Sequence, residues 1–188
     1  MPLIIGLMGQ KRSGKDTFAE RLVNEHGFVR LAFADALRQT ALDINPLIAP
    51  GGYLRLRDFV DAVGWEGAKT KPEVRRFLQE LGLAVRKNVH EDEWLDIVFA
   101  KIRVLRTQGK DVVITDVRFP NEANDIQIQP DGHLVRIDRP GLPDDDGHIS
   151  EHAWREIWPD TIVTNSGSVE DLHAHADALV ALWRGQLI

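Results

Sequence analysis

The segment GQKRSGKDT, from Gly9 to Thr17, has residue types and a spacing that suit binding of a polyphosphate. It fits the pattern G-x-x-x-x-G-K, in which glycines turn backbone N–H groups inward around phosphate oxygens and the lysine reaches the terminal phosphates. An apolar run at 3–8 precedes the loop and a helical pattern follows it, which is the context this chemistry needs. The candidate phosphate-binding residues are Gly9, Lys11, Arg12, Ser13, Gly14, Lys15, Asp16 and Thr17.

One position of this loop departs from the usual pattern. Asp16 stands where a serine or threonine would hold Mg²⁺, and Thr17 follows one residue later. We expect Asp16 to contact hydrated Mg²⁺ or to steer the basic residues Lys11 and Arg12, while Thr17 supplies the hydroxyl. The alternative is a glycine-rich turn in which Asp16 only stabilises the positive end of a helix.

A second candidate group lies on a predicted helix at 73–88. Its apolar side chains form one face, and Arg75, Gln79 and Arg86 fall within about 40° of one another on another face. Gly82 lies on the same line and removes side-chain bulk. Two guanidinium groups and an amide in this arrangement could clamp a phosphate and read a base edge. The alternative is an ordinary solvated helix face.

A third group follows the buried strand predicted at 111–115. Ligands of open α/β sheets gather beyond the carboxyl ends of the strands, so Asp116 should share an edge with the glycine loop. Asp116 could hold Mg²⁺ through water or orient a phosphate acceptor, and Arg118 could neutralise charge on a transferred group. The alternative is a polar strand end, with Asn121 capping the next helix.

The sequence HISEH at 148–152 matches the H-x-x-E-H pattern of a zinc peptidase family. That chemistry needs both histidines on one helical face. An acidic loop runs directly up to His148 and Ser150 is a suitable helix N-cap, so His148 should lie outside the helix. We therefore set a metallopeptidase aside. His173 and His175 are two residues apart on a predicted helix, so they diverge.

The elements that must position these groups alternate between strands and helices. Strands are predicted at 3–8, 28–33, 111–115, 133–137 and 161–164, and helices at 17–26, 35–44, 56–63, 73–88, 92–107 and 168–184. This alternation predicts an α/β fold with a parallel sheet covered on both faces. About eighty residues separate the second and third strands, too many for a simple crossover. We expect a helical lobe at about 35–108 inserted into a core of 1–34 and 109–188.

The composition limits the class of protein. The chain has 188 residues with a formal charge of −6, so we expect one domain and no broad nucleic-acid-binding surface. It has no cysteine, which excludes disulfides and thiolate metal sites and fits a reducing compartment such as the cytoplasm. No apolar run approaches membrane-spanning length, and the first residues lack the features of a signal peptide.

Six short motifs occur in order along the chain: GQKRSGKDT, RRFLQELG, TDVRFPNEA, the RP of Arg139–Pro140, HISE and TNSGSVEDL. Together they resemble the deoxynucleoside monophosphate kinases of tailed bacteriophages. The resemblance implies a P-loop kinase with three α/β/α layers, a five-stranded parallel sheet in the order 2-3-1-4-5, a helical monophosphate-binding lobe and a lid at about 138–150. It also implies transfer of the γ-phosphate of ATP, with Mg²⁺, to a dNMP for phage DNA precursor synthesis.

The resemblance also implies roles for individual residues. Gly9 to Thr17 would hold the ATP phosphates, with Lys11 and Arg12 facing the transferred phosphate, and Arg139, Asn165 and Gly167 would lie in the lid and the adenine-side turn. The implied dNMP-binding residues are Lys11, Arg75, Arg76, Gln79, Trp94, Asp116, Arg118 and Glu122, and the implied catalytic residues are Arg12, Lys15, Asp116 and Arg118. Residues 45–72 match no motif, so the base-reading residues are not assigned.

Two other functions remain open at the level of sequence. The glycine loop alone would also suit another small-molecule P-loop kinase, such as one acting on dephospho-coenzyme A or phosphomevalonate, or a nucleotide-binding module that transfers nothing. The basic stripe on 73–88 and the Asp116–Arg118 pair favour an acceptor site. We expect small-molecule substrates, no nucleic-acid or membrane partner, and a monomer or homodimer.

Overall fold

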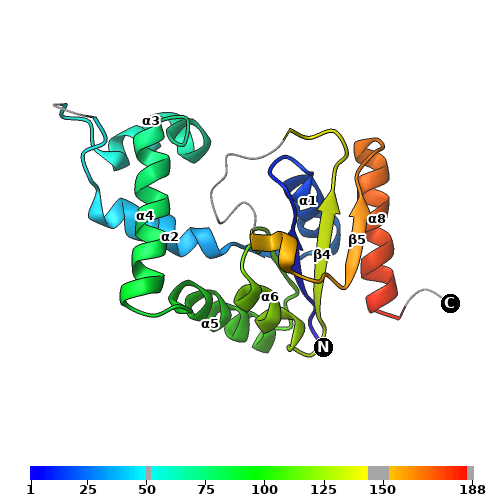
Figure 1. The fold of residues 1–188 in the computed structure, drawn as a ribbon. Coiled ribbons are helices and arrows are strands. Elements are labelled where there is room, and N and C mark those ends of the chain that lie inside the picture. Colours follow the sequence, from blue (N-terminus) through cyan, green and yellow to red (C-terminus); the bar gives the residue numbers. More distant parts are fainter. Residues whose placement is uncertain (50–51, 144–152, 186–188) are drawn as a thin grey trace. The chain divides into compact units, whose positions relative to one another are not determined.

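The computed structural model describes residues 1–49, 52–143 and 153–185 of the chain. The chain divides into two compact units, which are described separately (Figure 1). The core unit comprises Met1–Ala32 and Phe99–Ile188, and the helical unit comprises Phe33–Val98. The second boundary lies earlier than the expected position of 108, so most of the helix predicted at 92–107 belongs to the core unit.

The core unit is built on one parallel sheet. Its strands are β1 (Ile4–Met8), β2 (Val29–Leu31), β3 (Val112–Ile114), β4 (Gly132–Asp138) and β5 (Thr161–Thr164). They pair in the order β2-β3-β1-β4-β5. The predicted five-stranded α/β sheet and its order are confirmed. The two central strands β1 and β3 are fully buried, as their uninterrupted apolar sequences predict.

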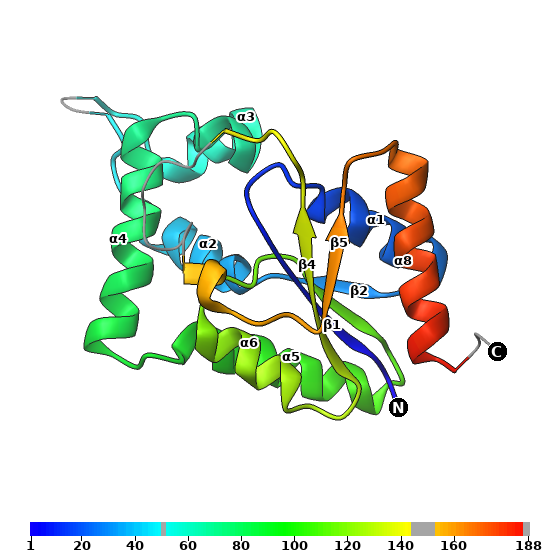
Figure 2. The same ribbon diagram turned by 45° about the vertical axis from the view of Figure 1, so that its right-hand side comes forward.

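Two helices cover one face of this sheet. They are α1 (Lys15–His26) and α8 (Val169–Trp183), which pack against each other (Figure 2). The buried side chains beneath them come from every third or fourth helix position and from alternate strand positions, as the two periodicities require. This cluster includes Ile5, Leu7, Phe18, Leu22, Val135, Ile137, Leu172, Ala176 and Val180.

Helix α6 (Pro120–Gln127) covers the other face and packs on β1 and β4. A Cβ atom on Gly6 would lie 2.7 Å from Ile126 Cδ1, so the glycine permits this close packing. The helix starts at Pro120, with Phe119 at the N-cap position, so the suggestion that Asn121 caps it was wrong. Proline at the first helical position has the φ angle a helix needs and therefore sets an earlier start. A short 3₁₀ helix, η1 (Ala153–Glu156), was not predicted.

The helical unit contains α2 (Phe33–Ile44), α3 (Leu56–Ala68), α4 (Pro72–Asn88) and the first residues of α5 (Glu93–Thr107). Its core gathers Ala41, Ile48, Leu56, Val60, Ala68, Val74 and Leu78. Helix α3 is interrupted at Gly64, whose φ of 70° is not helical, and it extends past the predicted end at 63. Within the described residues, none of the helices is both long and apolar enough to cross a membrane.

Candidate active site

The glycine loop leaves the carboxyl end of β1 and enters α1. Three of its residues have positive φ angles: Gly9 (130°), Arg12 (66°) and Gly14 (109°). A Cβ atom on Gly9 would run into the carbonyl oxygen of Ile137, and one on Gly14 into the side-chain amide of Asn165. Glycine is therefore required at both fixed positions of the motif, by conformation and by space.

Lys15 holds this loop together from within. Its Nζ donates to the carbonyl oxygens of Gly9, at 2.9 Å, and of Gln10, at 2.7 Å. The ammonium group therefore lies over the loop at the place where the motif requires a cation for terminal phosphates. Lys11 and Arg12 are exposed on the same loop and add positive charge.

The hydroxyl of Ser13 lies inside the loop without a partner. The side chain is 0% exposed, and its Oγ has no hydrogen bond within the part of the chain that the structure describes. A buried polar group in this state costs about 1–3 kcal/mol. Together with the inward-turned loop, this open group fits a ligand with oxygen acceptors, such as a phosphate.

The first turn of α1 carries the two candidate Mg²⁺ ligands. Asp16 is exposed and Thr17 is half-buried, and the helix has no side-chain cap at its N-cap residue Gly14. The free N–H groups of this turn favour an anion. Among the described residues, no three His, Cys, Asp or Glu side chains are grouped to hold a metal ion. Asp16 and Thr17 thus fit a cation that takes its other ligands from phosphate and water.

Helix α1 is fixed to α8 by a charged cluster. The carboxylate of Asp177 accepts a bidentate pair of hydrogen bonds from Arg21, at 2.9 and 2.8 Å, and lies 2.8 Å from Nε2 of His26. The hydrogen bond from Arg21 is the main reason that the pKa of Asp177 falls from 3.8 to about 2. This cluster supports the helix whose N-terminus forms one wall of the phosphate loop.

Asp116 lies at the same edge of the sheet as the loop. Ile114 on β3 pairs with Gly6 on β1, and the hydrogen bond from Val117 N to Leu7 O continues this pairing past the end of β3. This bond shifts the register by one residue, so Val117 is level with Met8, the last residue before the glycine loop, and Asp116 and Arg118 flank Val117. Asp116 and Arg118 are both half-buried.

Glu122 has a role that the sequence analysis did not anticipate. It is 2% exposed, and its Oε2 accepts hydrogen bonds from the backbone N–H groups of Arg118, at 2.8 Å, and Phe119, at 3.0 Å. The carboxylate thus fixes the turn that carries Arg118. The sequence did hold an indication of this, because a glutamate three residues after an N-cap position commonly bonds back to the N-cap backbone.

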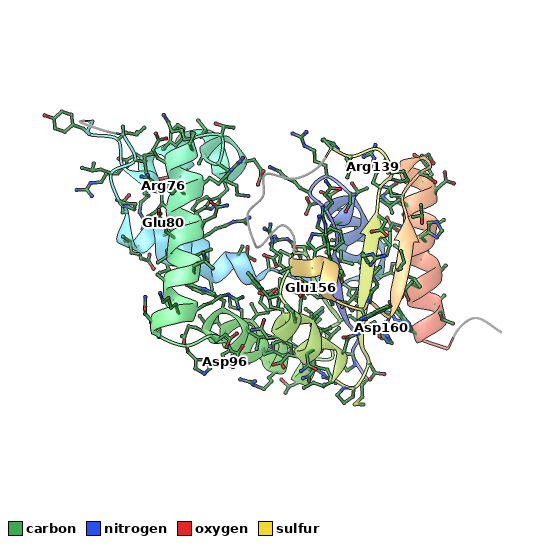
Figure 3. All side chains as sticks on the ribbon, viewed as in Figure 1. Arg76, Glu80, Asp96, Arg139, Glu156 and Asp160 are labelled. Carbon is green, nitrogen blue, oxygen red and sulfur yellow. The ribbon has the colours of Figure 1, made fainter. Side chains whose placement is uncertain are left out.

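Asn165 joins the last strand to the loop. Its backbone N–H donates to Asp138 O at 2.7 Å, and its side-chain amide donates to Ser13 O at 2.8 Å. Arg139 is exposed just after β4 (Figure 3). The side chain of Gln10 donates to the carbonyl oxygen of Pro143 and so connects the loop to the start of the predicted lid. The remaining lid residues at 144–150 and the HISEH motif lie outside the described residues.

In the helical unit, the residues of α4 that were predicted to bind the monophosphate nucleotide lie on two faces of the helix. Arg75 and Arg76 are exposed and Gln79 is half-buried, but Arg76 points about 100° away from Arg75 around the helix. Arg76 lies 3.7 Å from Glu80, and both line a cavity of about 270 Å³ with Leu47, Ile48, Glu73 and Phe77 (Figure 3). Trp94 is 5% exposed and its indole N–H donates to Gly82 O at 3.3 Å.

Comparison with known proteins places this geometry in a family. A family model described as deoxynucleotide monophosphate kinase matches residues 60–176, which is more than half of the chain. The chain belongs to the deoxynucleotide monophosphate kinase family. The kinase is 30% identical, over 183 residues, to a protein of Acanthamoeba polyphaga mimivirus that is named a deoxynucleotide monophosphate kinase. That similarity covers 92% of this chain and 93% of the relative.

The kinase is also similar in fold to the dephospho-CoA kinase from Campylobacter jejuni. The TM-score is 0.55, the identity is 15%, and each chain is covered completely. Family membership makes the protein a phosphotransferase. The family match at 60–176 includes Arg75, Asp116 and Asn165 but starts after the glycine loop, so the assignment of the loop depends on its own geometry.

Proposed function

We propose that the kinase transfers the γ-phosphate of ATP to a deoxynucleoside monophosphate and so forms a deoxynucleoside diphosphate. The observation that carries this proposal is the position of the glycine loop and its Lys15 at the same sheet edge as Asp116 and Arg118. A phosphate donor and a phosphate acceptor would then meet at one edge. The family name and the mimivirus relative support the choice of acceptor. The product would supply DNA precursors, the role that the likeness to bacteriophage enzymes implies.

On the donor side, the loop from Gly9 to Thr17 would hold the β- and γ-phosphates of ATP. The backbone N–H groups and the hydroxyl of Ser13 would donate to phosphate oxygens, and Lys15 would exchange its two carbonyl partners for a terminal phosphate oxygen. Asn165 holds the loop in shape through Ser13 O. The adenine would lie toward the turn that contains Asn165 and Gly167.

A divalent cation fits the donor side of the site. Asp16 and Thr17 supply a carboxylate and a hydroxyl, which are hard oxygen ligands of the kind that Mg²⁺ prefers. When bound, Mg²⁺ would neutralise part of the polyphosphate charge. Lys11 and Arg12 compensate the negative charge of Asp16 at the loop.

On the acceptor side, Arg118 would neutralise charge on the transferred phosphoryl group, and Asp116 would orient the acceptor. Phosphoryl transfer depends mainly on positioning and charge neutralisation, and an acceptor phosphate is already ionised, so the site needs no strong general base. Arg75 and Gln79 of α4 would bind the monophosphate nucleotide. Arg139 would close the site from the lid and exclude water.

The test of this proposal is an assay of ADP release with each of dAMP, dGMP, dCMP and dTMP, and with the four ribose counterparts. We expect dNMP-dependent ADP release well above the rate with ATP alone. Dephospho-coenzyme A and phosphomevalonate serve as alternative acceptors in the same assay. Turnover of either one, with none of any dNMP, would contradict the proposal.

Substitution of the two central cations tests the assigned roles. We expect Lys15→Ala and Arg118→Ala to fold normally and to lose about 10²–10⁴-fold in kcat/KM, since each removes a charge that stabilises the transferred phosphoryl group. Lys101→Ala and Arg103→Ala on the exposed side of α5 are matched controls. An Arg118→Ala enzyme with wild-type turnover would remove that residue from the mechanism.

A further inference from the structure

Strand β4 carries a basic residue, Arg136, to which neither the motifs nor the family resemblance gave a role. Arg136 pairs in register with Met8 of β1. On the other side of β1, Val117 N donates to Leu7 O, which sets Val117 level with Met8 just past the end of β3. Arg136, Met8 and Val117 therefore mark the same edge of the sheet, immediately below the glycine loop, and Asp116 and Arg118 flank Val117.

Arg136 faces the α6 side of the sheet. Its neighbours Val135 and Ile137 both belong to the core beneath α1 and α8, and side chains alternate along a strand. On this same side, a Cβ atom on Gly6 would contact Leu134, Ile126 and Val117. Parallel strands lie about 4.8 Å apart, so the Cα atoms of Arg136 and Val117, one on each side of β1, are about 10 Å apart, and Asp116 and Arg118 adjoin Val117. A phosphate group with its hydrogen-bond partners fits such a span.

The guanidinium of Arg136 is only partly used by the protein. Its Nε donates to Asp138 Oδ2 at 3.1 Å, and within residues 1–49, 52–143 and 153–185 this is the only hydrogen bond or ion pair of the side chain. The side chain is 24% exposed. The two Nη groups thus remain available, while Asp138 restrains the orientation of the group. A guanidinium with two open donors matches two oxygens of one phosphate.

We propose that Arg136 binds the 5′-phosphate of the acceptor nucleotide, together with Arg118 on the other side of β1. Asp138 is a positioning residue that holds Arg136 toward the edge of the sheet. This inference rests on the proposed dNMP kinase function and adds a specific acceptor contact to it.

The test compares Arg136→Gln, Arg136→Lys and Asp138→Asn with the control Arg103→Gln. We expect Arg136→Gln to raise KM for the best dNMP substrate at least tenfold and KM for ATP less than threefold, because the contact is made on the acceptor side only. The KM of Arg136→Lys for the dNMP should lie between those of the wild type and Arg136→Gln, since lysine keeps the charge but loses the planar guanidinium. Asp138→Asn should raise KM for the dNMP less than threefold, because the guanidinium stays and only the restraint on its orientation is weakened.

Two results would overturn this role for Arg136. One is a KM for the dNMP in Arg136→Gln within twofold of the wild type. The other is an equal rise in Arg136→Gln and Asp138→Asn, which would make the pair a structural ion pair of β4. Thermal unfolding of all variants checks that each one is folded, and Arg136→Lys keeps the test valid if the glutamine variant is unstable.

Direct calorimetric binding of the same dNMP separates this inference from the proposed function. A wild-type protein that binds the dNMP through Arg136 but releases no ADP would contradict the kinase reaction and support the site. Normal turnover with unchanged dNMP binding in Arg136→Gln would contradict only the site. Absence of dNMP binding by the wild type would contradict both.

Discussion

Asp16 is the residue at which this glycine loop departs from the usual pattern, which has a serine or threonine there. It is exposed in the first turn of α1, beside Thr17. If Asp16 contacts the hydrated cation, Asp16→Ser should raise the Mg²⁺ concentration for half-maximal turnover several-fold. Glu20→Ser, one turn further along α1, is the matched control. Unchanged Mg²⁺ dependence and turnover in Asp16→Ser would leave this residue only the role of stabilising the helix end.

Glu122 acts at the residue scale through the backbone of its neighbours. Because its buried carboxylate accepts from two N–H groups, Glu122→Ala should lower the free energy of unfolding by about 1–3 kcal/mol and reduce kcat by misplacing Arg118. Glu122→Gln keeps one acceptor oxygen, so its free energy of unfolding and its kcat should lie between those of the wild type and Glu122→Ala. Urea unfolding and ADP release measure the two effects. A Glu122→Gln enzyme that is fully stable but inactive would instead indicate direct contact with substrate.

Only some of the site residues were predictable from sequence. The loop from Gly9 to Thr17 could be proposed from sequence because its chemistry is contained in nine consecutive residues. Arg136 was not found, because its position at the site depends on the register between β1 and β4, which are distant in sequence. The hydrogen bond from the Asn165 amide to Ser13 O could not be predicted either, because the two residues are 152 positions apart and form no local pattern.

At the scale of elements, the contact between α1 and α8 should depend on pH. The pKa of Asp177 falls from 3.8 to about 2 in the folded protein, so its contribution is complete above pH 3.8 and is lost as the pH falls toward 2. Asp177→Asn should therefore be less stable than the wild type near neutral pH and equal to it below pH 2. The difference should stay below about 1 kcal/mol and shrink with salt, because the ion pair is partly exposed.

Unfolding midpoints of the two proteins across this pH range provide the measurement. Asp43→Asn, at a carboxylate on α2 paired with Arg57, is the control for a general charge effect. A stability difference that does not change between neutral pH and pH 2 would show that Asp177 acts by packing rather than by charge.

The strands were easier to predict than the helix boundaries. Buried strands such as β1 and β3 are continuous apolar runs bounded by polar or glycine residues, so their positions follow from composition. The start of α6 was misplaced because Phe119, an unusual N-cap residue, is followed by Pro120. The interruption of α3 at Gly64 could not be predicted, since an isolated glycine inside a helical pattern usually only weakens it.

At the scale of the whole molecule, ATP should stabilise the folded chain. A ligand at a hundred times its Kd adds about 2.7 kcal/mol, which for a chain of this length raises Tm by about 5–10 °C. Lys15→Ala should show a much smaller shift, because its loop lacks the cation that holds the terminal phosphates. Thermal unfolding with and without ATP and Mg²⁺ measures this difference. An equal shift in both proteins would place ATP binding elsewhere.

The bond between Asn165 and Ser13 has a consequence for the order in which the chain is made. The glycine loop is synthesised before its neighbours β3 and β4, and the amide of Asn165 follows 152 residues after Ser13. At about 5–20 residues per second, the interval is about 8–30 s. During translation, the nascent chain would carry an unfinished loop, and the capacity to hold a nucleotide would appear only after Asn165 has emerged.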